Sequence, residues 1–87
     1  ERGHEQFMQG LTRGDASAMQ AAIEDFTVAI SLNPTYRGHY LERGTAYLYL
    51  GETEKAEQDF ATSRLYGTEE RDILRNKALV NAALKQR

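Results

Sequence analysis

The chain has 87 residues, of which 40% are hydrophobic and 28% are charged, as expected of one folded domain and too apolar for a disordered segment. A formal net charge of −2, with Lys and Arg scattered along the chain, argues against a nucleic-acid partner, because phosphate binding needs a basic surface. The lack of cysteine excludes disulfides and zinc–thiolate sites, and the apolar runs are too short for a membrane span.

Five helices are predicted, because Ala, Leu, Gln, Glu and Arg are abundant and the apolar residues recur with a helical period. Turns of two to four residues between them predict antiparallel helical hairpins. In chain order, the predicted helices cover about Arg2–Thr12, Ala16–Leu32, Thr35–Leu50, Thr53–Tyr66 and Thr68–Arg87.

Turn residues separate the first three helices. Arg13-Gly14-Asp15 closes the first helix, and either Asp15 or Ser17 is expected to cap the second. Ser17 with Gln20 also fits a capping box. Asn33-Pro34 ends the second helix, since Asn tolerates the left-handed conformation and Pro cannot donate the next helical hydrogen bond.

The later boundaries rest on glycine and threonine. Gly51 and Gly67 are expected to end the third and fourth helices. Thr53 and Thr68 are the predicted N-caps of the fourth and fifth, each followed by acidic residues that favour the positive end of the helix dipole.

The sequence contains an internal repeat. Ala22-(x3)-Phe26 recurs as Ala56-(x3)-Phe60, and the first copy continues to Asn33-Pro34. This pattern resembles the tetratricopeptide repeat, which consists of two antiparallel helices and has a period of about 34 residues, the same as the offset between the two copies.

The resemblance implies an all-α solenoid of antiparallel helix-hairpin repeats, about two repeats plus a C-terminal capping helix. The repeats would span 1–34 and 35–68, and the capping helix 69–87. Gly44 and Ala56 would let two helices approach closely, while Tyr40, Tyr47 and Phe60 fill the space between hairpins. One repeat period further on, Ala78 takes the small position and Leu74 the large one. Arg43 departs from the family pattern, which is normally apolar there.

The first hairpin contains seven extra residues. Glu1-Arg2-Gly3 and the later Gly10 recur as Glu42-Arg43-Gly44 and Gly51, an offset longer by those seven residues than the one between Phe26 and Phe60. Because an α-helix has about 3.6 residues per turn, one extra turn on each helix would keep both apolar faces in phase. The alternative is a disordered bulge over Thr12–Ser17. In this register Glu1 falls inside the first helix, so we expect the chain to be part of a longer protein.

Nothing in the sequence predicts catalysis, a bound metal or a cofactor. His4 and His39 occupy non-equivalent repeat positions and form no metal-spaced pair, and no phosphate-binding or nucleophile motif occurs. Tyr40 and Tyr47 are expected in the core, whereas Tyr49 lies on another helix face and is the more plausible contact residue. The chain is therefore predicted not to be an enzyme.

The resemblance implies a concave groove, lined by the first helix of each repeat, that binds a peptide or protein segment. The alternative is self-association, as a homo-oligomer or as a scaffolding element of a larger repeat protein. Glu42 and Asp72 stand where the chaperone-binding members of the family have Asn and Lys, which argues against that specific role. The expected groove residues are His4, Phe7, Met8, Leu41, Thr45, Leu48, Tyr49, Asp72, Arg75 and Leu79.

The partner is thus predicted to be a protein or peptide, with Arg75 offered to a carboxylate and the apolar floor to a hydrophobic anchor. Neither a nucleic acid nor a membrane is expected. The sequence leaves the compartment open, although a soluble cytoplasmic protein is favoured.

Overall fold

The computed structural model describes residues 2–86, so Glu1 of the repeated Glu-Arg-Gly motif and Arg87 at the predicted end of the last helix lie outside the described residues. Within this range the chain forms five α-helices and no strand. The prediction of an all-α fold is confirmed. The helices are α1 (Arg2–Arg13), α2 (Ala16–Leu32), α3 (Arg37–Tyr49), α4 (Thr53–Leu65) and α5 (Glu70–Lys85).

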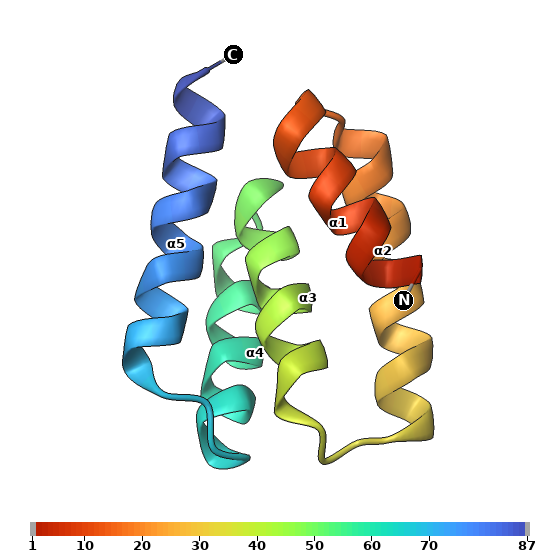
Figure 1. Cartoon of the computed structure of the whole chain (residues 1–87). Coiled ribbons are helices and arrows are strands. Elements are labelled where there is room, and N and C mark those ends of the chain that lie inside the picture. Colours follow the sequence, from red (N-terminus) through yellow and green to blue (C-terminus); the bar gives the residue numbers. More distant parts are fainter. Residues whose placement is uncertain (1, 87) are drawn as a thin grey trace.

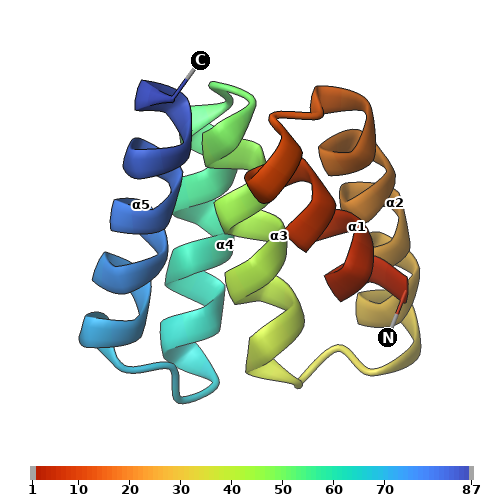
Figure 2. The ribbon, with the colours of Figure 1, turned by 45° about the horizontal axis from the view of Figure 1, so that its top comes forward.

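The helices form two antiparallel hairpins and a single last helix (Figure 1). α1 packs on α2, α3 packs on α4, and the hairpins meet through α2 and α3. α5 packs mainly on α3 and also reaches α1. Figures 1 and 2 show α1, α3 and α5 on one face of the molecule, with α2 and α4 behind them.

Three glycines make the predicted turns. Gly14, Gly51 and Gly67 have φ values of 64°, 82° and 108°, a backbone region that residues other than glycine rarely adopt. Asn33 differs from the prediction, since it ends α2 with φ −145° and not in the left-handed conformation.

The predicted caps are correct only in part. The Asp15 carboxylate accepts a hydrogen bond of 3.1 Å from the backbone N–H of Ala18, so Asp15 caps α2. The N-cap positions of α4 and α5 are Glu52 and Glu69, without side-chain hydrogen bonds. Thr68 is instead buried and hydrogen-bonds to Ser63, which fixes the turn between α4 and α5.

The core has two parts joined across α3. The larger part lies between α1, α2, α3 and α5, and the smaller lies between α4 and α5. Tyr47 and Leu48 of α3 pack against both parts and make them continuous. The larger cluster contains Phe7, Met19, Ala22, Ile23, Phe26, Ala46, Tyr49 and Val80, and the smaller contains Ala56, Phe60 and Ile73.

The same glycine–phenylalanine contact holds each hairpin together. A Cβ atom added to Gly3 would lie 2.9 Å from Phe26 Cε1, and one added to Gly44 would lie 2.9 Å from Phe60 Cε1. Real Cβ atoms essentially never lie this close to another atom, so a side chain at either position would force the ring or the helix to shift. The two hairpins therefore make the same contact, although the two glycines are further apart in the sequence than the two phenylalanines.

An ion pair accompanies each of these contacts. Arg2 lies 3.6 Å from Asp25, whereas Arg43 donates two hydrogen bonds of 2.8 Å to Asp59 and a third, of 3.2 Å, to the Thr27 hydroxyl. Hydrogen bonding to Asp59 raises the pKa of Arg43 above its usual value. The polar residue that departs from the family pattern thus links α2, α3 and α4.

The extra residues of the first hairpin lie within helices. α1 continues ten residues beyond Gly3, whereas α3 continues only five beyond Gly44. α2 begins six residues before Ala22, whereas α4 begins three before Ala56. Only Gly14 and Asp15 separate α1 from α2, so the hairpin extends by about one turn on each helix.

Candidate protein-binding groove

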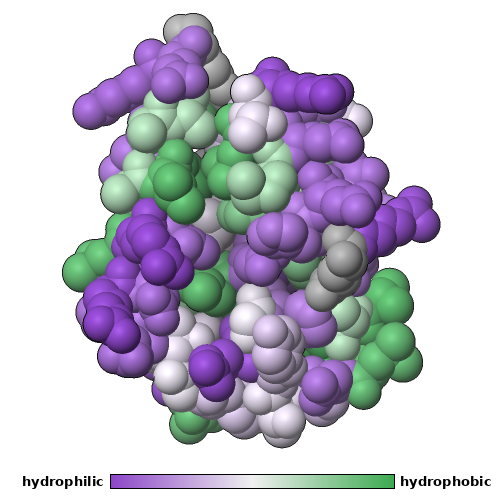
Figure 3. Space-filling model, in the orientation of Figure 1, coloured by the Kyte–Doolittle hydropathy of each residue, from purple (hydrophilic) through white to green (hydrophobic). Residues whose placement is uncertain are grey.

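The face formed by α1, α3 and α5 carries exposed apolar side chains. Met8 on α1 is 41% exposed and Leu79 on α5 is 49% exposed, while Leu41 and Leu48 of α3 lie half-buried between them. Figure 3 shows apolar surface gathered over the upper half of α5 and the neighbouring end of α1, with polar surface below it. Four of the predicted groove residues are therefore apolar and accessible.

Three predicted groove residues are instead buried, and their assignment to an open groove surface is corrected. Phe7 is 4% exposed and its ring packs edge-on against Phe26 in the core. Thr45 is fully buried because α5 lies over it, and the Asn76 amide donates a hydrogen bond of 3.0 Å to its hydroxyl. These side chains support the groove from below.

Tyr49 is the third buried residue, so the prediction that it is a contact residue is wrong. It is only 3% exposed, because it belongs to the larger core cluster with Phe7 and Val80. Tyr40 and Tyr47, expected in the core, are both half-buried, and Tyr47 packs against both core clusters as predicted. The Tyr40 hydroxyl donates a hydrogen bond of 2.7 Å to the Pro34 carbonyl, and its ring stacks on Tyr66.

The polar groove residues form two pairs. His4 Nδ1 on α1 lies 3.1 Å from a Glu42 carboxylate oxygen on α3. On α5, Arg75 lies 3.4 Å from Asp72, so the guanidinium already has an acidic neighbour. Both pairs are partly exposed, and such pairs contribute little to stability and remain open to competition from a ligand.

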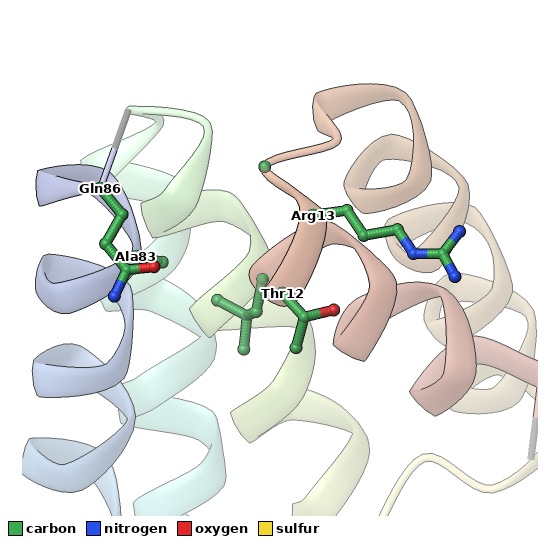
Figure 4. Close-up of a pocket in the computed structure, with 6 residues that line it drawn as sticks. Thr12, Arg13, Ala83 and Gln86 are labelled. Atoms are coloured by element: carbon green, nitrogen blue, oxygen red, sulfur yellow. The ribbon is translucent and has the colours of Figure 1, made fainter.

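One end of the groove lies between the last turn of α1 and the last turns of α5. A pocket of about 260 Å³ lies there between the ends of α1 and α5, with Thr12 and Arg13 on one side and Ala83 and Gln86 on the other (Figure 4). The Arg13 side chain points away from α5. Leu11 and Ala83 line this end of the groove, and neither was among the groove residues predicted from the sequence. Leu11 lies one helical turn after Phe7, and Ala83 lies one turn after Leu79. This helical spacing from predicted groove residues could have identified both positions.

The acidic residues and histidines among residues 2–86 form no candidate metal site. No group of three or more His, Asp or Glu side chains in that range could hold a metal ion. His39 packs against the rings of Phe26 and Tyr36, with centroids 6.2 and 4.7 Å away, which is a structural role. Within the same range, no helix is both long enough and apolar enough to cross a membrane.

Comparison with known proteins identifies a relative. The chain is 31% identical over 67 residues to Tetratricopeptide repeat protein 6 of Homo sapiens. The matched region covers 77% of this chain and 13% of that protein, so the chain corresponds to a small part of its relative. No family model matches the chain, and no solved structure matches it significantly.

Proposed function

Because this chain belongs to the tetratricopeptide-repeat family, we propose that it is a protein-interaction module whose groove between α1, α3 and α5 binds a peptide or protein segment. The observation that carries the proposal is the pair Met8 and Leu79, two large apolar side chains that remain about half exposed on this face. Exposed apolar residues that cluster on one face and have polar neighbours are typical of interaction sites.

The groove favours an apolar anchor with a neutral or basic neighbour. Leu41 and Leu48 form an apolar floor, and burial of an anchor there stabilises a complex by roughly 25 cal/mol for each Å² removed from water. Glu42 and Asp72 are acidic, and Asp72 already lies beside Arg75. A C-terminal carboxylate would meet these acids, so we expect internal segments to bind better than free C-termini.

Leu79→Arg should abolish binding by this groove without unfolding the chain, because Leu79 is half exposed and arginine is a good helix former. The probe is a set of peptides selected from a random library on the unmodified chain, and the measurement is fluorescence anisotropy. We expect Kd to rise at least tenfold with Leu79→Arg and with Met8→Arg. Leu48 is less suitable for this test, because it also packs against both core clusters.

Val28→Arg is the matched control. Val28 is 59% exposed on α2, away from the groove, so this substitution should leave Kd unchanged. Peptides whose affinity is insensitive to Met8 and Leu79 would show that the groove is not the binding surface.

A scaffolding role is the second candidate, supported by exposed apolar residues outside the groove. Leu32 on α2 is 80% exposed, and Leu65 on α4 is 76% exposed. In this role the chain would supply repeats 1–34 and 35–68 and the terminal helix 69–87 to a larger array, since solenoid repeats bury such faces against their neighbours. Light-scattering mass across a hundredfold concentration range separates the two: a constant 9.9 kDa favours peptide binding, and a rise toward a dimer favours assembly.

A further inference from the structure

One polar bridge crosses the groove from α1 to α3. His4 Nδ1 lies 3.1 Å from Glu42 Oε2, and the two side chains are 55% and 27% exposed, so a bound segment can reach both of them. Met8, one of the exposed apolar groove residues, lies one helical turn after His4 on α1 and therefore on the same side of that helix. A ligand that covers Met8 with an apolar side chain thus has the bridge beside it.

The bridge needs a proton on His4 Nδ1. A carboxylate oxygen only accepts hydrogen bonds, so the imidazole nitrogen that faces Glu42 has to be the donor. The imidazolium always carries this proton and adds an ionic attraction, whereas the neutral ring carries it in only one of its two tautomers. Because histidine side chains gain their charge as the pH falls from about 8 to about 5, the bridge strengthens over this range.

Glu42 is the acid that the imidazole faces among residues 2–86. Glu5 follows His4 in α1, but adjacent residues of a helix do not face each other. Charged groups on the surrounding helices that pair elsewhere include Arg2 with Asp25 of α2, Arg43 of α3 with Asp59, and Asp72 with Arg75 of α5. Arg13 and Lys85 lie in the last turns of α1 and α5, whereas His4 lies near the start of α1.

We propose that Glu42 recognises a basic residue of the segment bound in the groove, and that His4 competes with this residue for Glu42, so that binding weakens as the pH falls. The inference rests on the proposed function of the groove and specifies its partner as a segment with lysine or arginine beside the apolar anchor. Above about pH 7 the neutral imidazole is the weaker donor, and the ligand cation takes the carboxylate. Below about pH 6 the imidazolium holds the carboxylate and repels the incoming cation.

The probe is a rhodamine-labelled peptide with one lysine and no histidine, taken from the random library after selection on the unmodified chain at about pH 7.5. Only peptides whose affinity falls in Leu79→Arg are used, because these bind in the groove. Fluorescence anisotropy at low ionic strength gives Kd across the pH range. We expect Kd to rise about fivefold between about pH 7.5 and about pH 5.5, as a partly exposed ion pair allows.

Three matched controls assign the effect. His4→Gln retains a hydrogen-bond donor that does not titrate, so it should keep the Kd measured at about pH 7.5 and remove the pH dependence. Glu42→Gln should raise Kd about fivefold at about pH 7.5 and also make it independent of pH. The same peptide with norleucine in place of lysine should bind the unmodified chain with a Kd that does not change with pH.

Several results would overturn the proposal while the groove itself stands. These are groove-binding peptides without any basic residue, a Kd that stays constant across the pH range, or a pH dependence that survives in His4→Gln. The last result would assign the titration to another group, such as His39. Peptides whose affinity is insensitive to Leu79→Arg would overturn the groove and this inference together, so the two failures are distinguishable.

Discussion

Gly44→Leu should lower the free energy of unfolding by about 3 kcal/mol, because the added side chain overpacks the contact between α3 and α4. A Cβ alone would lie 2.9 Å from Phe60 Cε1 and 3.1 Å from the Asp59 Cβ, so a leucine cannot fit unless α3 and α4 separate. The better helix propensity of leucine offsets only about 1 kcal/mol of this cost. Urea unfolding followed by circular dichroism measures the change.

Ala78→Leu is the matched control for this substitution. It places the same side chain at the equivalent position of α5, where the surface is open, so the midpoint of unfolding should stay within the error of the wild type. Equal stability of the wild type and Gly44→Leu would contradict the close α3–α4 contact described above.

Arg43→Met should lower the free energy of unfolding by about 3 kcal/mol, because it leaves the Asp59 carboxylate buried without its charged partner. The two side chains are 19% and 7% exposed, and both carboxylate oxygens accept hydrogen bonds from the guanidinium. Methionine retains most of the aliphatic stem, so packing changes little. Thermal and urea unfolding both report the loss.

A double-mutant cycle isolates the pair. Asp59→Asn removes the negative charge, and the variant that carries both Arg43→Met and Asp59→Asn should be more stable than the sum of the single effects predicts, by about 1–3 kcal/mol. Additive effects would show that Arg43 contributes through packing and not through Asp59. At Arg2–Asp25, where Arg2 is 82% exposed, the same cycle should give under about 1 kcal/mol.

Much of the fold could be predicted because local signals determine it. Glycine is strongly favoured at positive φ, so the turn glycines are easy to recognise, and helical periodicity places the remaining boundaries within about two residues. The caps were less predictable, since Thr68 has the right residue type for a cap but lies buried against Ser63. Whether a threonine caps a helix or fills a turn depends on the tertiary contact, which is not a local property.

The groove was harder to predict than the helices. Helical position places Thr45 and Tyr49 on α3, but their exposure depends on how α5 and the first hairpin lie over that helix. Arg43 also departs from the apolar pattern for a reason that is not local, since its partner is Asp59. Asp59 lies sixteen residues away, on a face that only the α3–α4 packing brings together with Arg43.

The contact between the lengthened α1 and the last turns of α5 has a consequence for unfolding. In a helical solenoid each repeat contacts only its neighbours, so the terminal helices fray independently of one another. Here Val80 of α5 shares a core cluster with Phe7 of α1, and Leu11 and Ala83 pack against that cluster. The first and last helices therefore lose contacts together, and amide hydrogen exchange should show both protected to a similar free energy of opening. The contact between α1 and α5 thus makes the first and last helices one cooperative unit.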